Sequence, residues 1–250
     1  MSNQAFEVYE RELEEQHTRN EARRIRTRVN EARRSPHTAG IRWPFELLQN
    51  ALDAGPRAGN TAVTIALRHQ DHAVVFEHDG APFTLRELAA LLSGGSSKQF
   101  ESEETTGRFG TGFLVTHVLA ERTHLEGLLV VGSDHELFRL VLDRAGDEDA
   151  ILKNIRACKD AIRAAVAIPS PDSVPSARFE YLLDSTESLG LGLESFHQAL
   201  PYLYATRSKL GQVTIQSHDG KIEEWIPSPA SIETVPEGVV HNRDILVRTR

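Results

Sequence analysis

Helical patterns dominate the first hundred residues of the chain. Residues 6–34 contain no Gly or Pro and many strong helix formers, so they predict a long helix. The stretch RWPFELLQNALDAG at 42–55 predicts a second helix, with Pro44 near its first turn, where a missing N–H costs little. Residues 84–92 predict a short third helix, because they open with a Thr-x-x-Glu capping box.

Short runs of β-branched and apolar residues predict strands between and after these helices. Residues 61–68 and 72–77 alternate or cluster such residues and predict the two strands of a hairpin. Five more strands are predicted farther along the chain, at 128–132, 136–144, 178–183, 211–217 and 242–250. Three further helices are predicted at 113–122, 147–167 and 193–205, the last of them broken or bent at Pro201.

Composition narrows the class of protein. A chain of 250 residues, 40% of them hydrophobic, can bury the core of one large domain or of two small ones. The formal net charge of −8 argues against a free-standing nucleic-acid binder, which usually carries a basic face. The single cysteine, Cys158, cannot form an internal disulfide and fits a reducing compartment. No apolar run approaches the roughly 20 residues that span a bilayer, and the first residues lack the layout of a signal peptide, so we expect a cytoplasmic protein without a membrane partner.

The predicted helix at 42–55 carries an unusual polar stripe. Helical residues advance by about 100° each, so Glu46, Asn50 and Asp53 lie within one narrow stripe while the opposite side is apolar. The apolar side is suited to packing on a sheet. The polar stripe then faces either solvent, as on many surface helices, or a ligand.

Three later segments favour a ligand. The second strand of the predicted hairpin ends in EHDGAPF, where Gly80 lets the backbone approach a bound group closely. The segment SGGSSK offers hydroxyls and a cation, including Ser97 and Lys98. The segment TTGRFGTGF then opens a predicted helix, and such a glycine-rich loop lets backbone N–H groups face an anion. The glycine spacing matches neither a P-loop nor a dinucleotide-binding fingerprint.

The order of these motifs resembles that of the GHKL ATPases, which include gyrase, the ninety-kilodalton heat-shock chaperones and histidine kinases. The resemblance is close over residues 40–120 and looser to about residue 183. The segments HDGAPF and GRFGTGF look most like those of the chaperone-related branch that includes sacsin. The resemblance implies the Bergerat fold, an α/β two-layer sandwich whose mixed, mainly antiparallel sheet carries helices on one face. It also implies ATP as ligand and Mg²⁺ as cofactor.

The resemblance assigns roles to the polar stripe. Glu46 is implied to be the general base that activates water, and Asn50 is implied to bind the Mg²⁺ that bridges the phosphates. Asp53 is implied to support the nucleotide site. These residue types suit the chemistry, because a carboxylate can take a proton from water and an amide oxygen suits hard Mg²⁺ without adding charge.

The adenine-binding motif departs from the family pattern Asp-x-Gly-x-Gly. When the motif is matched on Gly80, His78 occupies the aspartate position, and a neutral histidine can accept a hydrogen bond from the adenine amino group. Matching Asp79 to that aspartate instead leaves Ala81 where the first glycine belongs. The alternative for His78 is a strand-end histidine with no ligand. The family also has a late-strand threonine near adenine, for which this chain offers Ser176 or Ala177.

The resemblance assigns the phosphates to the loop that follows the third helix. Lys98, beside Ser97, is implied to reach the phosphates or ribose, although an ordinary exposed lysine explains it equally well. Residues 93–110 are implied to form a lid. The glycine-rich segment is implied to wrap the phosphates through its backbone, with Gly107, Arg108, Phe109, Gly110, Thr111, Gly112 and Phe113.

The predicted function is Mg²⁺-dependent ATP binding and slow hydrolysis that drives conformational change or dimerisation of a larger protein. The chief alternative is a nucleotide-gated binding module with little or no hydrolysis, and a structural protein without nucleotide is a third. The predicted organisation is a helical extension at 1–40, an ATP-binding domain at 41–185 and an additional α/β segment at 186–250 that begins a following region. The expected partners are ATP or ADP and a second copy, bound through the N-terminal helix or the lid.

Overall fold

The structure, a computed structural model, describes residues 3–94, 112–168, 174–228, 231–235, 238–242 and 244–250. Its helices are α1 (Asn3–Arg34), α2 (Pro36–Ala54), α3 (Leu85–Ser93), the 3₁₀ helix η2 (Phe113–Val118), α4 (Glu148–Arg163) and α5 (Glu187–Thr206). Its strands are β1 (Val63–Gln70), β2 (Ala73–His78), β3 (Arg122–Val131), β4 (Asp134–Asp143), β5 (Val166–Ala167), β6 (Ala177–Leu182), β7 (Leu210–Gln216), β8 (Ile222–Pro227), β9 (Ser231–Val235), β10 (Gly238–Asn242) and β11 (Ile245–Thr249).

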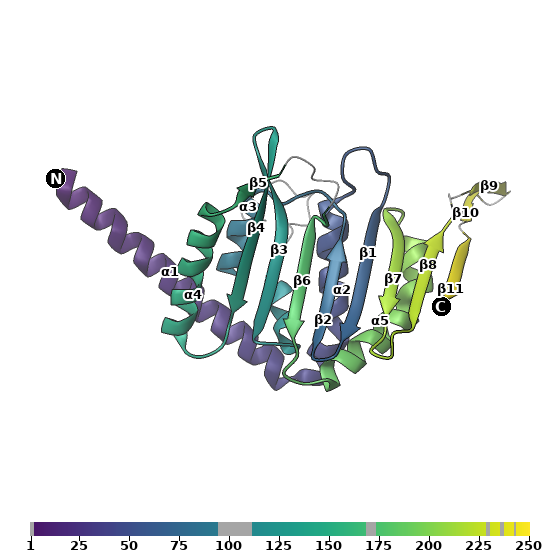
Figure 1. Cartoon of the computed structure of the whole chain (residues 1–250), viewed down its shortest axis with the longest axis horizontal. Coiled ribbons are helices and arrows are strands. Elements are labelled where there is room, and N and C mark those ends of the chain that lie inside the picture. Colours follow the sequence, from purple (N-terminus) through teal and green to yellow (C-terminus); the bar gives the residue numbers. More distant parts are fainter. Residues whose placement is uncertain (1–2, 95–111, 169–173, 229–230, 236–237, 243) are drawn as a thin grey trace.

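Nine of the described strands form one sheet, in the order β11-β8-β7-β1-β2-β6-β3-β4-β5 (Figure 1). Within the described ranges, β1 and β7 are the one parallel pair, and the other neighbours run antiparallel. The strands β9 and β10 form a separate hairpin. The predicted mixed, mainly antiparallel sheet is therefore confirmed.

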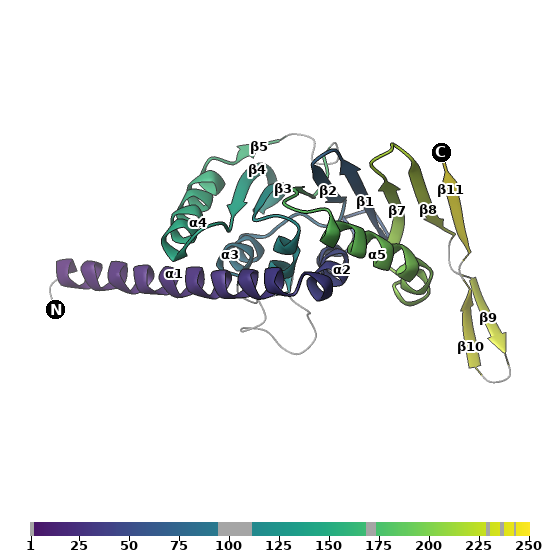
Figure 2. The ribbon, with the colours of Figure 1, turned by 90° about the horizontal axis from the view of Figure 1, so that it is seen from below.

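The helices α1, α2, α3 and α5 lie on one side of this sheet (Figure 2). Strand residues alternate accordingly, and in β6 the inward residues are buried while Arg178 and Glu180 face outward. On the outward face Glu77 pairs with both Arg68 and Arg178, and Arg178 also pairs with Glu180. A charged, mutually paired surface of this kind is suited to water, so the apolar core lies on the helical side.

Helix α2 packs against α5 on the helical side of the sheet. Its Trp43 is fully buried, and the indole N–H donates to the carbonyl of Ser188 in α5 at 3.0 Å. A side chain at Gly192 would collide with that indole, and it would also lie 2.8 Å from the carbonyl of Gly40. Gly40 in α2 and Gly192 in α5 therefore let the two helices approach closely around Trp43. This contact fixes the rotation of α2 about its own axis.

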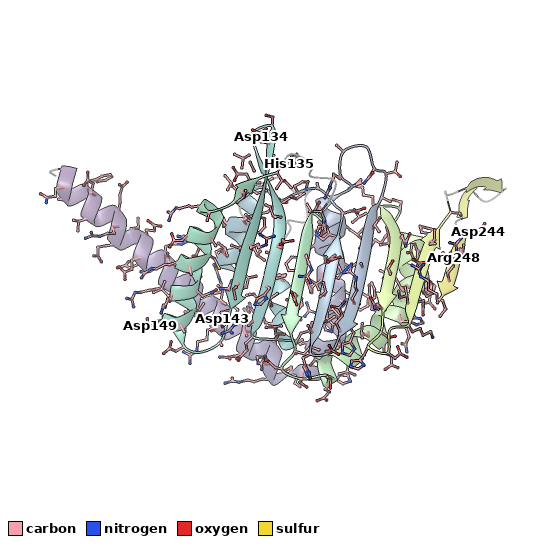
Figure 3. All side chains as sticks on the ribbon, in the orientation of Figure 1. Asp134, His135, Asp143, Asp149, Asp244 and Arg248 are labelled. Carbon is pink, nitrogen blue, oxygen red and sulfur yellow. The ribbon has the colours of Figure 1, made fainter. Side chains whose placement is uncertain are left out.

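Helix α4 covers the edge of the sheet at β4. The Asn154 amide donates to the carbonyl of Val141 at 2.7 Å and accepts from the N–H of Asp143 at 3.1 Å. Figure 3 labels Asp143, at the end of β4, and Asp149, in the first turn of α4. The Asn154 side chain thus forms hydrogen bonds with backbone groups of β4 that would otherwise be unpaired at the edge of the sheet.

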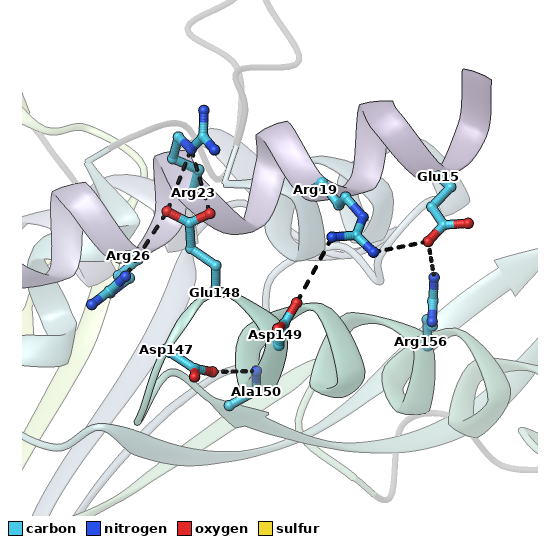
Figure 4. Close-up of polar contacts among 9 residues, drawn as sticks. All are labelled: Glu15, Arg19, Arg23, Arg26, Asp147, Glu148, Asp149, Ala150 and Arg156. Carbon is cyan, nitrogen blue, oxygen red and sulfur yellow. Dashed lines mark hydrogen bonds and ion pairs between the residues drawn. The ribbon is translucent and has the colours of Figure 1, made fainter. Parts of the chain in front are cut away.

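Helix α1 contacts α4 through ion pairs and through apolar packing. Figure 4 shows Glu148 between Arg23 and Arg26, and Arg19 reaching Asp149. Exposed pairs of this kind usually contribute less than about 1 kcal/mol each. Beneath them lies a second core cluster, made of Ala22, Ile25, Val29, Leu114, Ile151, Leu152 and Ile155. Burial of this cluster is therefore what mainly holds α1 to η2 and α4.

Several local predictions can be compared with the structure. The capping box of α3 is present, with both the Thr84 and the Glu87 side chains bonded as expected. The helix predicted at 113–122 is wrong in type and length, because η2 ends at Val118 and β3 begins at Arg122. Of the predicted break or bend at Pro201, the break is wrong, because α5 continues through this residue. No helix in the described part of the chain is long and apolar enough to span a membrane.

The segment at 186–250 contributes to the same sheet as the preceding residues. Strand β7 pairs in parallel with β1, and β8 and β11 follow it outward. Helix α5 packs on α2 at Trp43. Strands β5, β8, β9 and β10 were not predicted. The sequences of β8, β9 and β10 mix charged residues, proline and glycine without a clear alternation, and β5 lies at the end of the helix predicted at 147–167, which stops at Arg163.

The packing of α2 on α5 leads to a first prediction. Gly192→Ala should destabilise the protein by about 2 kcal/mol or more, because the new methyl group overlaps a rigid, buried indole. Gly190→Ala, in the same helix, meets open space and should stabilise by about 0.5–1 kcal/mol through helix propensity. Urea unfolding of both variants measures the difference. Equal effects of the two substitutions would contradict the close approach.

Buried His117, in η2, leads to a second prediction. Its Nδ1–H donates to the carbonyl of Ala120 at 3.1 Å, and burial lowers its pKa to about 3, helped by repulsion from Arg144. The unfolded chain therefore binds a proton below about pH 6.5 that the folded chain does not, so stability falls as the pH drops toward 3. The expected loss from this group is about 1.4 kcal/mol per pH unit.

The matched variant is His117→Asn, whose amide can still donate to the Ala120 carbonyl but does not titrate. Urea unfolding between pH 6 and pH 4.5 should show a steeper loss of stability in the wild type than in this variant. Parallel curves would show that His117 is not buried in its neutral form.

Candidate functional site

The polar stripe of α2 does not face open solvent. Asn50, at its centre, is only 8% exposed, and Glu46 and Asp53 on either side are half-buried. The helix has its apolar residues on the core, including Trp43 and Leu47. The explanation of the stripe as an ordinary solvated surface therefore fails at its central residue.

At one end of the stripe, Glu46 lies against the start of η2. A Cβ atom at Gly112 would overlap the Glu46 carboxylate, so the absence of a side chain there is what makes room for it. The other carboxylate oxygen accepts a hydrogen bond from Arg42, one turn earlier in α2, at 2.8 Å. The carboxylate is thus held between a guanidinium and the backbone of a glycine.

At the other end, the last residues of α2 meet the turn after β2. A Cβ atom at Gly80 would lie 3.0 Å from both the Cβ of Ala54 and the carbonyl oxygen of Gly55. The N–H of Ala81 donates to the same Gly55 carbonyl at 2.9 Å, and Pro56 pairs with Gly80 as an antiparallel bridge. Gly80, the glycine of the His78-Asp79-Gly80 turn (the HDG turn), therefore permits a close backbone contact with the end of α2.

The two candidate adenine-binding residues have different surroundings. His78 is buried, and its Nδ1 accepts a hydrogen bond from the N–H of Gly80 at 3.2 Å. In the neutral tautomer that this bond requires, Nε2 carries the proton and acts as a donor. The Asp79 carboxylate accepts from the N–H of Thr64 in β1 at 2.6 Å and so ties the end of β2 to β1.

Ser176 lies beside this turn. Its hydroxyl donates to the carbonyl of Gly80 and accepts from the guanidinium of Arg57 at 2.6 Å. Arg57 also donates to the carbonyl of Val174 at 3.1 Å. Of the two residues considered for the late-strand contact, Ser176 thus has its polar group at the HDG turn, whereas Ala177 is a core residue of β6.

Two arginines near the stripe were not identified from the sequence. Arg42 pairs with Glu46, and its position four residues earlier in the helix is the one signal that points to it. Arg57 follows the Gly55-Pro56 turn, and no sequence pattern connects it with Ser176. The role of Arg57 therefore becomes visible only once the fold brings Ser176 beside it.

The glycine-rich segment is described from Gly112 onward. The Phe113 side chain is buried and packs on Phe179, with ring centroids 5.5 Å apart, so any contact of this residue with a ligand must use its backbone. The remaining loop residues of the predicted site lie outside the described residues, namely Ser97, Lys98, Gly107, Arg108, Phe109, Gly110 and Thr111. The same applies to the predicted lid beyond Gly94.

A polar cavity of about 270 Å³ adjoins the Glu46 end of the stripe. Arg28, Ser35, Thr38 and Arg42 line it together with Gly112. In the described ranges, no three His, Cys, Asp or Glu side chains converge as a ready-made metal site. A cation bound at the stripe would therefore need oxygens from a second bound group, as is usual for Mg²⁺ bound together with phosphates.

The structure thus brings together residues from three motifs that are far apart in the sequence. Glu46, Asn50 and Asp53 come from α2, the HDG turn lies at one end of this helix, and Gly112 lies near the other. Comparison of the chain with protein-family models and with curated proteins gives no match in either case.

Proposed function

We propose that this protein binds Mg²⁺-ATP and hydrolyses it slowly, in an α/β two-layer sandwich of the GHKL type, the Bergerat fold. The observation that carries the proposal is the convergence of the motifs on α2. Glu46 lies against Gly112, and the end of α2 lies against Gly80. Ala54 lies eight positions after Glu46 in the helix, or roughly 12 Å away, which gives an elongated ligand room along the stripe.

The proposed chemical end of the site is at Glu46. A general base must reach a water molecule and must accept its proton, and a half-buried carboxylate can do both. The contact with Gly112 leaves no side chain between this carboxylate and the start of η2. Arg42 fixes the direction of one carboxylate oxygen, which supports a role in orienting the base.

Asn50 is suited to hold Mg²⁺ through its amide oxygen. Its side chain is buried one turn from Glu46, and a neutral oxygen ligand combines well with charged phosphate oxygens. When bound, Mg²⁺ would neutralise part of the phosphate charge and orient the terminal phosphate. The protein contributes the position of Asn50 on a helix that is fixed by the packing of Trp43.

The proposed base-binding end is at the HDG turn. His78, Asp79 and Ser176 surround Gly80, so a purine there would meet a compact set of polar groups. With Nδ1 engaged by Gly80, His78 would read a hydrogen-bond acceptor on the base rather than the adenine amino group. Asp79 would have to accept a second hydrogen bond beside the one from Thr64, which a carboxylate can do.

The second candidate is a module that binds nucleotide but scarcely hydrolyses it. The observation in its favour is the ion pair between Arg42 and Glu46, because the guanidinium already occupies one oxygen of the carboxylate that would have to accept a proton from water. In either case we propose that nucleotide binding drives a conformational change or the dimerisation of a larger protein.

The third prediction separates these two candidates. Glu46→Ala should leave Mg²⁺-ATP affinity nearly unchanged and should lower turnover by about 10²- to 10⁴-fold, the usual contribution of a general base. Asn50→Ala should weaken Mg²⁺-ATP binding itself, because it removes a ligand of the metal. Isothermal titration gives the affinity, and single-turnover hydrolysis at high protein concentration gives the rate.

Gln49→Ala is the matched control, because Gln49 is exposed on the same helix between the two tested residues. It should change neither affinity nor rate. If the wild type hydrolyses ATP no faster than Glu46→Ala while both bind it, the protein is a binding module. If none of the proteins binds nucleotide, the proposed function is wrong.

A further inference from the structure

A second, apolar cavity lies away from the polar stripe, between α1, α3 and α4. Its volume is about 550 Å³, within the range of roughly 300–1,000 Å³ that is typical of ligand pockets. Six large aliphatic side chains line it, namely Leu13, Leu85, Leu88, Leu92, Ile155 and Ile162. The groove is therefore built from three helices and is mainly apolar.

Large apolar side chains continue from the groove onto the surface. Leu85, at the start of α3, is 59% exposed, and Leu13 in α1 is 53% exposed. Phe6 and Tyr9 extend the same stripe of α1 toward its beginning, and both are about half exposed. Soluble proteins rarely leave contiguous apolar surface of this kind uncovered unless it binds a partner.

Carboxylates form one wall of the groove. Glu10, Glu14 and Glu21 line it from α1, and the lining includes one lysine, Lys159. Lys159 is already paired with Glu14 at 3.3 Å, and Glu10 makes no ion pair in the part of the chain that the structure describes. The lining thus contains three carboxylates and one lysine, so this wall carries a net negative charge.

We infer that this groove binds an amphipathic helix of another protein, one with a bulky apolar ridge flanked by lysine or arginine. The apolar floor would accept the ridge, and the carboxylates of α1 would pair with the flanking cations. Charge complementarity at the rim would also speed association and exclude acidic partners. The inference does not depend on the proposed nucleotide site, because the aliphatic and acidic side chains that carry it do not belong to that site.

Charge also argues against a second copy, a fatty acid and an anionic membrane as occupants of the groove. In a second copy of this chain, the exposed Phe6 and Tyr9 are flanked by glutamates, so docking them here would bring carboxylates together. The basic half of α1 offers no alternative, because its apolar residues, such as Ile25, are buried in the core. A fatty acid or an anionic membrane would meet the same repulsion from Glu10 and its neighbours.

The fourth prediction tests this inference with two synthetic helical peptides of 14 residues, one of leucine and lysine and the other of leucine and glutamate with the same spacing. Fluorescence anisotropy of the labelled peptides with the whole protein measures binding. The leucine–lysine peptide should bind, and Leu85→Ser should weaken it about tenfold, as is typical when an interface anchor is truncated. The matched control is Leu182→Ser, because Leu182 is 41% exposed at the end of β6.

Two charge-reversal variants distinguish binding in the groove from general attraction of a basic peptide to an acidic protein. Glu10→Lys and Glu194→Lys change the net charge equally, but Glu194 lies in α5, away from the groove. Glu10→Lys should weaken the leucine–lysine peptide at least fivefold more than Glu194→Lys does.

Three outcomes would overturn the inference. Equal losses in the test and control variants would mean non-specific attraction. Binding of the leucine–glutamate peptide, or of neither peptide, would mean that the rim does not select a basic helix. A dimer in sedimentation that Leu85→Ser dissociates would mean that a second copy fills the groove.

Discussion

The packing of Trp43 between α2 and α5 is the constraint on which the rest of the site depends. The indole is fully buried, bonds to the carbonyl of Ser188, and has room only because Gly192 lacks a side chain. Since helical residues are related by fixed rotations, fixing the direction of Trp43 also fixes the direction of Asn50, seven residues later. The polar stripe of α2 is therefore oriented by an apolar contact on the core.

Both ends of this stripe depend on backbone contacts that glycine permits. Gly112 leaves room for the Glu46 carboxylate, and Gly80 lets the turn after β2 approach the end of α2. These residues were singled out from the sequence as elements of a phosphate-binding loop and of a base-binding turn. In the structure they make room for α2 as well, so one glycine can serve both the fold and a ligand site.

Local signals explain most of what could be predicted from the sequence. The hairpin of β1 and β2 and the capping box at Thr84 follow from short-range patterns, whereas the mainly antiparallel sheet was implied by the family resemblance. The helix at 113–122 was wrong because apolar residues at helical spacing also occur in a 3₁₀ turn that runs into a strand. Short apolar runs do not distinguish these structures without their tertiary contacts.

The partners of the site residues could not be predicted in the same way. Ser176 contacts Gly80 across 96 positions of sequence, and Arg57 contacts Ser176 across 119. Such contacts are determined by strand order and register, here the pairing of β2 with β6, which no local pattern encodes. The stripe at Glu46, Asn50 and Asp53 was visible in the sequence because a single helix carries all of it.

The central claim is that the stripe of α2 binds Mg²⁺-ATP, and thermal unfolding with and without nucleotide tests it most directly. At about 100 times the dissociation constant, Mg²⁺-ATP should stabilise the folded protein by about 2.7 kcal/mol. For a chain of this size the melting temperature should then rise by roughly 5–10 °C. Asn50→Ala should show little of this shift under the same conditions. An unchanged melting temperature of the folded wild-type protein at millimolar Mg²⁺-ATP would contradict the account.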